Sequence, residues 1–340
     1  MLSRLANPAF HNSSVALKSG TAAILARHFV TTTLRNARTA GFRAKTFSEQ
    51  FAFKARTTVA PTLRERLLGP TTGKPYVYGT YALAGASVFG VGMLCYYGLG
   101  MSKEINAFDR SALWPAYVRQ RLQTTYGYLT GSLALTAAAG MAAARSPMIM
   151  RLTSTGSLWA FLGSLALIVG TGTIARSIPY ENTMAKHVAW AAHSGVLGAV
   201  LAPLCVLGGP ALLRAAWYTA GLVAGLSATA ICAPSEKFLN MAGPLAMGLG
   251  VVFVANIGSF FFPPHTALGA GLASVVVYGG LILFSAFLLY DTQKIIRAAE
   301  TTPQGGGFDP INAQMSLYMD IMNIFIRIAM LVGGGGQRRK

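Results

Sequence analysis

The chain has 340 residues, of which 53% are hydrophobic and only 11% are charged. Soluble globular domains carry about 25% charged residues, so this composition and a mean hydropathy of +0.48 exclude an ordinary soluble fold. The formal net charge is +18, but no soluble segment combines a basic patch with interleaved aromatic residues, so we expect no nucleic-acid partner. The composition predicts an all-α polytopic membrane protein whose main surroundings are the lipid bilayer.

The first 48 residues contain no acid, seven Lys or Arg and eleven Ser or Thr. This composition is typical of a mitochondrial transit peptide. A secretory signal needs an unbroken apolar region, and Lys18, Arg27 and His28 interrupt every candidate for one. A disordered basic tail is the third alternative, but it does not explain the absence of acids. Residues 49–75 form a basic arm that leads into the first apolar run.

Eight apolar runs follow, each close to the ~20 residues that a helix needs to cross a ~30 Å hydrocarbon core. Their limits are 76–100, 124–144, 153–175, 188–212, 215–233, 238–262, 266–292 and 311–332. The runs are twice as long as a barrel strand and do not alternate, so they predict helices in an antiparallel bundle. Eight spans place both ends of the chain on the same side of the membrane. Import of a cleaved presequence would place that side in the matrix. Gly127 with Gly131, and Gly221 with Gly225, have the spacing of close helix crossings.

One polar stripe crosses the last apolar run. Its members follow one another at steps of four, three and four residues: Ser316, Asp320, Asn323 and Arg327. On a helix this spacing gives a single face. A charge that faces lipid costs at least ~2.5 kcal/mol, so the face must turn toward a protein interior or a watery cavity. The stripe is therefore a candidate ion or proton path.

Asp291 follows the preceding apolar run directly. The signals that end a helix come only at 301–307, so we expect the helix to continue past Asp291, although an interfacial Asp291 paired with Lys294 is an open alternative. Asp320 lies ~14 Å into its own run, close to the midplane. Arg327 is ~10 Å further along, too far for a direct pair. Since the chain has only ten acids, Asp291 is one of few groups that Asp320 could meet.

Other polar residues in the runs carry weaker signals. His193 lies inside the fourth run, where hydrogen-bonded packing and a proton relay are equally compatible with the sequence. Cys95, Cys205 and Cys232 lie in apolar runs without C-x-x-C spacing, which predicts buried hydrophobic residues and neither a disulfide nor a metal site. We expect no cofactor.

The last two runs resemble a known family. Segments 278–293 (YGGLILFSAFLLYDTQ) and 316–325 (SLYMDIMNIF) are similar to the last two spans of the transmembrane Bax inhibitor motif family. Four further segments resemble, more narrowly, the mitochondrial inner-membrane branch of that family: 94–100 (LCYYGLG), 176–180 (RSIPY), 214–221 (RAAWYTAG) and 233–241 (APSEKFLNM). The resemblance covers roughly residues 76–335.

The resemblance implies a division of the chain into five parts. These are a transit peptide at 1–48, the basic arm at 49–75, an extra span and loop at 76–123, a seven-helix core at 124–335 and a basic tail at 336–340. It also implies a pair of aspartates, Asp291 and Asp320, that share a proton, bind Ca2+ and gate a Ca2+ path in response to pH. An Arg on an early core helix locks the pair in the family, whereas the 124–144 run has only Arg145 at its edge.

Three classes of function compete at this point. The resemblance implies Ca2+/H+ exchange or a Ca2+ leak across the mitochondrial inner membrane, and facing carboxylates that hold a proton until a divalent cation replaces it suit that chemistry. The alternative is a structural protein with an anti-apoptotic effect, which organises cristae and retains cytochrome c with cristae-organising or inner-membrane protease partners. Intramembrane aspartyl proteases also use two aspartates, but their Gly-x-Gly-Asp motif is absent at Asp320, so we expect no enzyme.

Overall fold

The computed structural model describes residues 67–69, 73–98, 110–234 and 237–336. The predicted transit peptide (1–48), most of the basic arm (49–75) and nearly all of the basic tail (336–340) lie outside these residues. The described residues fold into helices without a strand, which confirms the predicted all-α class.

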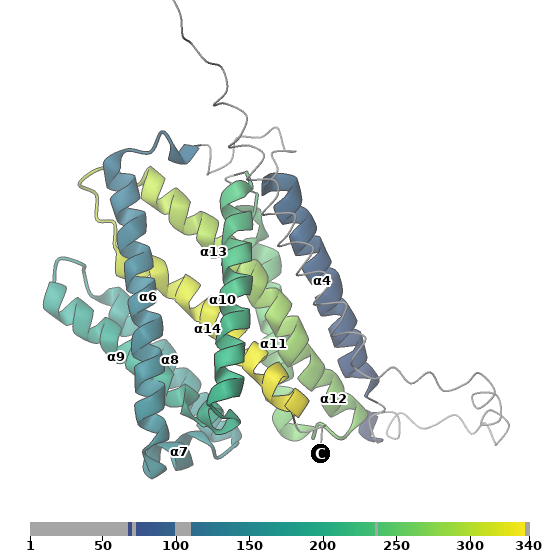
Figure 1. Cartoon of the computed structure of the whole chain (residues 1–340). Helices are drawn as coiled ribbons and strands as arrows, with labels where there is room; N and C mark the ends of the chain where they lie inside the picture. Colours follow the sequence, from purple (N-terminus) through teal and green to yellow (C-terminus); the bar gives the residue numbers. More distant parts are fainter. Residues whose placement is uncertain (1–66, 70–72, 99–109, 235–236, 337–340) are drawn as a thin grey trace, which may run out of the picture. The chain divides into compact units, whose positions relative to one another are not determined.

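The helices follow one another along the chain in Figure 1. They are α4 (Lys74–Gly98), α6 (Ala116–Ala144), α7 (Pro147–Thr153), α8 (Leu158–Ser177), α9 (Thr183–Leu201), η2 (Ala202–Leu207), α10 (Gly209–Cys232), η3 (Leu239–Met241), α11 (Ala242–Phe261), α12 (Ala267–Ser274), η4 (Val275–Gly279), α13 (Gly280–Thr301) and α14 (Pro310–Gly336). In the described part of the chain, seven helices are long and apolar enough to cross a membrane. The pair α6 and α7, bent by 105°, makes an eighth if it counts as one span. Each of the eight predicted runs therefore has its helix.

The last helix is the centre of the bundle. In the most apolar stretch of α14, 56% of the residues are buried, against 6% in the most apolar stretch of α4. α14 packs on α13, α6 and α10, and Figure 1 shows it crossing the interior between them. A helix so enclosed by protein can carry polar side chains that would be excluded from a lipid-facing surface.

Two helices extend furthest beyond the predicted runs. α6 begins at Ala116, eight residues before the run 124–144, so Arg121 belongs to a helix and not to a loop. Its guanidinium donates to the carbonyls of Ala299, Thr302 and Pro303 at 2.6–3.1 Å. These carbonyls lie at the end of α13, where a helix leaves its last acceptors unpaired. Arg121 thus caps α13, which runs to Thr301, well past Asp291, as predicted.

The start of α14 is fixed by an ion pair that the sequence did not predict. Lys186, on α9, is completely buried, and its ammonium lies 2.6 Å from Asp309 Oδ2. The same ammonium donates to the carbonyls of Ala175 and Ile178 and to Asn312 Oδ1 at 2.8–2.9 Å. Asp309 Oδ1 accepts from the Asn312 amide at 2.9 Å, which caps α14. One buried cation therefore ties α8, α9 and α14 together.

The closest helix crossing lies elsewhere than the glycine spacing predicted. A Cβ added at Gly127, Gly221 or Gly225 would meet nothing within 4 Å, so these residues do not make a crossing; one at Gly131 would only approach the Trp190 ring at 3.2 Å. On α9, by contrast, a Cβ at Gly198 would lie 2.5 Å from the Thr136 carbonyl oxygen of α6. The prediction was wrong because small-xxx-small spacing is frequent in apolar helices and does not itself say which face meets a neighbour.

Candidate functional site

Asp291 and Asp320 lie together inside the bundle. Asp291 comes from α13 and Asp320 from α14, each is only 5% exposed, and the two carboxyl groups interact with one another. Two facing carboxyl groups cannot both ionise cheaply in a low-dielectric interior, so such an arrangement favours a pair that holds a proton. The structure thus brings the two predicted site residues together.

The pair has one further partner and one free acceptor. The Ser316 side chain, one turn before Asp320 on α14, interacts with Asp291. Asp320 Oδ2 is buried and has no partner in the described structure. A buried polar atom without a partner is costly unless water or an ion reaches it. This oxygen is therefore the atom of the site with capacity for a further ligand.

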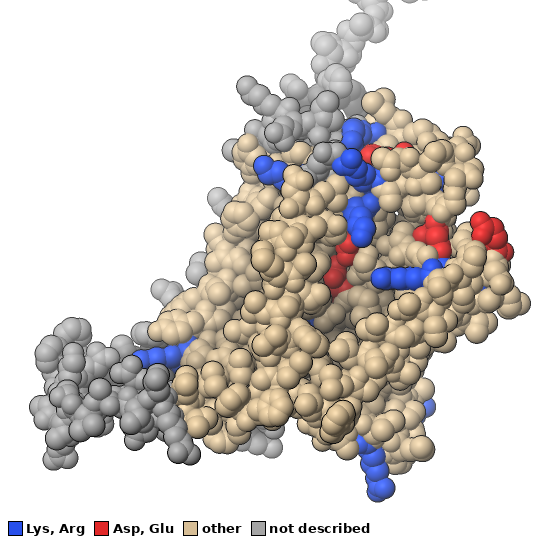
Figure 2. Space-filling model, turned by 180° about the vertical axis from the view of Figure 1, so that it is seen from behind, with Lys and Arg blue, Asp and Glu red and all other residues tan. Residues whose placement is uncertain are grey.

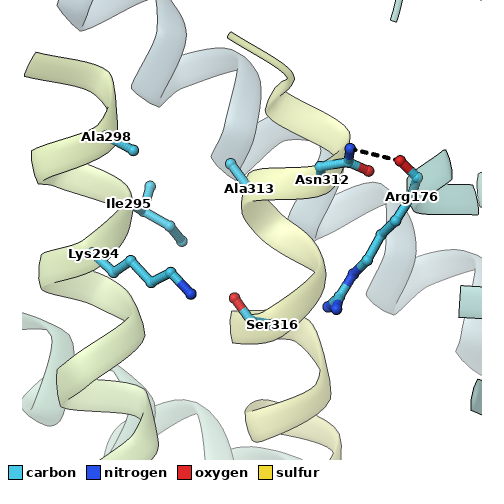
Figure 3. A pocket seen from close by; sticks show the side chains of 7 residues that line it. All are labelled: Arg176, Lys294, Ile295, Ala298, Asn312, Ala313 and Ser316. Carbon is cyan, nitrogen blue, oxygen red and sulfur yellow. Dashed lines mark hydrogen bonds between the residues drawn. The ribbon is translucent and has the colours of Figure 1, made fainter. Parts of the chain in front are cut away.

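A cavity of about 280 Å³ opens beside the pair. It is lined by Arg176, Lys294, Ile295, Ala298, Asn312, Ala313 and Ser316, and Figure 3 shows the side chains of Arg176 and Lys294 extending from opposite sides toward Ser316. A second cavity of about 450 Å³ shares Arg176 and Asn312 with the first. In the view from behind, Figure 2 shows acidic side chains in a hollow with basic ones near it. The first cavity lies next to the pair, since Ser316 lines it and interacts with Asp291.

The cations of the cavity act on Asp291 from a distance. Both Lys294 and Arg176 have an electrostatic effect on Asp291, but in the part of the chain described here neither makes an ion pair with it. The Lys294 ammonium lies 5.7 Å from the centre of the Tyr290 ring. The alternative of an interfacial Asp291 paired with Lys294 is thus not what the structure shows.

Arg327 and Asn323 complete the stripe on the far side of the pair. Arg327 is 6% exposed, and its Nη1 donates to the backbone and side-chain oxygens of Asn323 at 2.8 and 3.0 Å. Its guanidinium lies 4.5 Å from the centre of the Phe284 ring. Among the described residues, no carboxylate forms an ion pair with Arg327, as its distance along the helix from Asp320 predicted.

The expected locking Arg is not at the pair in this conformation. Arg145 is the C-cap residue at the end of α6, and Arg121 holds the end of α13. Arg176 and Lys294 line the site instead. Arg176 lies near the end of α8, and the packing of α8 against α14 brings it to the cavity.

His193 belongs to a different polar layer, between α14 and the helices α6, α8 and α9. It is 2% exposed, its Nδ1 lies 3.0 Å from Thr171 Oγ1, and its ring centre is 6.1 Å from that of Tyr318. Tyr318 in turn hydrogen-bonds to Thr136. These contacts are those of hydrogen-bonded packing, and they do not reach the aspartate pair.

The donors at the pair are carboxyl and hydroxyl oxygens. The described residues contain no cluster of three or more His, Cys, Asp or Glu that could hold a metal ion, and Cys95 and Cys205 are free thiols. Ca2+ takes six to eight oxygen ligands. Two carboxylates and the Ser316 hydroxyl supply at most five, so a bound Ca2+ would keep part of its water shell and could leave again.

Comparison with known proteins places the chain in a family. Residues 118–338 match the family model described as inhibitor of apoptosis-promoting Bax1. The chain is 52% identical over 284 residues to the growth hormone-inducible transmembrane protein of Rattus norvegicus, a match that covers 82% of each chain. It is 27% identical over 249 residues to Bax inhibitor 1 of the same organism, covering 69% of this chain and 98% of that one. A protein of Helicobacter pylori strain 26695, described as uncharacterized, is 30% identical over 218 residues, covering 62% of this chain and 85% of that one. The chain is therefore a multi-pass membrane protein of the Bax inhibitor family.

Proposed function

We propose that this protein moves Ca2+ across the mitochondrial inner membrane through the aspartate pair, in exchange for protons or as a leak that pH controls. The observation that carries the proposal is the meeting of Asp291 and Asp320, two carboxyl groups buried among membrane-spanning helices. Carboxyl groups so placed are rare in membrane helices, and where they occur they commonly mark ion pathways or proton relays.

The chemistry of the pair couples the two ions. Without a bound cation the pair holds a proton, because two facing carboxylates cannot both ionise cheaply in a low-dielectric site. A divalent cation that binds between the two groups takes the place of that proton, and its two charges balance two carboxylates. Loss of Ca2+ returns a proton to the pair. The pair titrates as one unit and not as two independent acids.

The cavity supplies access from one side. Ser316 lines the cavity and also interacts with Asp291, so Asp320 lies one helical turn beyond the cavity wall. Arg176 and Lys294 place positive charge at this opening, which lowers the local concentration of cations. A site of this kind binds Ca2+ weakly and releases it readily, as transport requires.

The mitochondrial location rests on the first 48 residues, whose acid-free, basic and Ser/Thr-rich composition suits import into mitochondria. The proposed Ca2+ path and this location are separate claims, because the former can be tested with purified protein and the latter only in cells.

Reconstituted transport tests the proposal. Purified protein in liposomes with an entrapped Ca2+ indicator should take up Ca2+ when a pH gradient is imposed, and uptake should fall as the Ca2+-loading side is acidified, because protons compete for the pair. Asp320→Asn and Asp291→Asn should each remove the pH-driven component. Glu300→Gln is the matched control: Glu300 is an acid of the same helix as Asp291, but it pairs with Arg110 at 3.1 Å and lies away from the pair.

Two results would contradict the proposal. One is absence of Ca2+ uptake by the unmodified protein, and the other is uptake that survives both Asn substitutions with its pH response unchanged. Either outcome would favour the structural alternative, in which the protein organises cristae through partners and the aspartates do not matter.

A further inference from the structure

Arg327 is held in the interior of the bundle by a specific set of acceptors. Besides Asn323 and Phe284, it reaches across to the preceding helix, where its Nε donates to the carbonyl of Val276 at 3.1 Å. A charged side chain among membrane helices normally lines a pathway or pairs with another charge. Arg327 makes no ion pair in the part of the chain described, so backbone and amide oxygens and one aromatic ring compensate its charge.

The carbonyl of Val276 lies where the helix changes its winding. Val275–Gly279 form a π-helical turn between α12 and α13. At the end of this turn, the amide of Gly280 is directed to the carbonyls of Val275 and Val277, whereas that of Val276 accepts from Arg327. Single π-helical turns inside α-helices occur often at functional sites. Here the turn presents an acceptor to a charge on the neighbouring helix.

Gly280 makes room for the guanidinium. A Cβ added at Gly280 would lie 2.1 Å from Arg327 Nε, a distance that no side chain could tolerate without displacing the Arg. A Cβ added at the adjacent Gly279 would meet only Val275 Cγ1, at 3.7 Å, which is ordinary contact. The position of Arg327 therefore depends on Gly280 and not on its neighbour.

Arg327 and the cavity lie on opposite sides of the aspartate pair. Ser316, which lines the cavity, is four residues before Asp320 on α14, and Arg327 is seven residues after it. At ~1.5 Å per residue these are ~6 Å in one direction and ~10 Å in the other. The polar stripe ends at Arg327, since the next residue on the same face is Leu331.

We propose that Arg327 is the gate of the ion path: seated on Gly280 and on the Val276 carbonyl, it closes the side of the aspartate pair that faces away from the cavity. This inference rests on the proposed function, because a gate implies a path. The guanidinium closes the path in two ways, by filling the space between α13 and α14 and by placing a positive charge ahead of an arriving cation. Opening requires Arg327 to leave the Val276 carbonyl, and the π-helical turn is the segment that can rewind when it does.

Accessibility of a cysteine between the pair and the gate tests this without relying on transport. The reporter is Asn323→Cys in a chain whose three native cysteines are replaced; it leaves Arg327 its bonds to the Asn323 backbone and to Val276 and its contact with Phe284. A charged, membrane-impermeant thiol reagent is applied to proteoliposomes from each side in turn. From the side opposite the cavity, the closed gate should keep the labelling rate low.

Two variants should open the gate by different routes. Arg327→Gln removes the charge, and Gly280→Ala displaces the guanidinium without removing it. Each should raise the labelling rate from that side by about tenfold or more, the order that follows from losing one hydrogen bond to a charged group. Gly279→Ala is the matched control and should label like the parent, and Arg327→Lys, which keeps the charge but not the forked geometry, should fall between parent and Arg327→Gln.

Unchanged labelling in both Arg327→Gln and Gly280→Ala would overturn the gate, as would an equal rise in Gly279→Ala. If Arg327 only stabilised the bundle, its substitution would lower the melting temperature without producing this pattern of labelling. The result is also independent of the Ca2+ experiment, since labelling reports water access and needs no transported ion.

Discussion

Lys186 and Asp309 form an ion pair of 2.6 Å in which the lysine is completely buried. The pair joins α9 to the first residue before α14, the helix that carries Asp320, so it positions the site from outside it. Breaking a buried pair by removing one partner costs about 3–5 kcal/mol, because the other charge stays buried without compensation.

We therefore expect Lys186→Met to destabilise the protein strongly, because it leaves the Asp309 carboxylate and three other oxygens without their donor. Asp309→Asn should do the same by leaving the lysine uncompensated. The double variant should be more stable than the sum of the two losses predicts, since no charge is then left unpaired. Thermal unfolding of the purified protein in detergent measures this, with the exposed Lys237→Met as control; strictly additive losses would show that the two residues do not act as a pair.

The crossing of α6 and α9 gives a second prediction about stability. Gly198→Ala would place a methyl group 2.5 Å from the Thr136 carbonyl oxygen and 2.8 Å from Ala139 Cβ, so the helices must move apart. Overpacking of this kind costs about 1–3 kcal/mol. Gly195→Ala on the same helix meets nothing within 4 Å and should be neutral or slightly stabilising. Equal melting temperatures for the two variants would argue against the close crossing.

Hydropathy sufficed to predict the spans but not their ends or their partners. Eight runs of about 20 apolar residues follow from the thickness of the bilayer, and each has its helix. The start of α6 at Ala116 and the extension of α13 to Thr301 lie in polar sequence, where hydropathy gives no signal. Hydropathy also gives no sign that Lys186 is buried, since lysines rarely are, and its burial depends on Asp309, which is far away in the sequence.

The residues of the candidate site, too, could be predicted from the sequence only in part. The polar stripe on α14 indicated Asp320 as a site residue. The scarcity of acids in the chain indicated that Asp320 meets Asp291, because few other groups could interact with a carboxyl at that depth. The π-helical turn at Val275–Gly279 had no signal in an unbroken apolar run. Nor could the spacing of residues show that Arg176 and Lys294 line the same cavity, since this depends on how α8, α13 and α14 pack.

Targeting can be tested by deleting residues 1–48. We expect the shortened chain to lose mitochondrial import while it still inserts into membranes, because all the helices that the structure describes lie after residue 48. Fractionation of cells that express tagged full-length and shortened chains measures the location. A shortened chain that still reaches mitochondria would show that the signal lies elsewhere. As a control, replacing the seven basic residues of the segment with Gln should act like the deletion.

Topology can be tested with tags at both ends. If the bent pair α6 and α7 counts as one span, the described helices make eight, and an even number places both tags on the same side, which we expect to be the matrix. Protease treatment of mitoplasts should then leave both tags intact, and detergent should expose both. Protection of only one tag would mean that one helix does not span, and the bent pair is the first candidate because its two halves differ in direction by 105°.

The two aspartates should behave as one unit in a double-variant cycle. Asp291→Asn and Asp320→Asn each leave an amide that can donate a hydrogen bond to the remaining carboxylate, so both proteins should fold while pH-driven Ca2+ uptake is lost. The double variant should cost little more than either single one, because members of one unit are not additive. Asp320→Leu is the informative comparison, as it leaves Asp291 buried with Ser316 alone and should also lower stability, by about 1–3 kcal/mol. Uptake measured for all four variants, with melting temperatures alongside, separates loss of the site from loss of the fold. If the losses of uptake in the two single Asn variants instead added up in the double variant, the carboxyl groups would be acting independently and the shared proton could not be the coupling element.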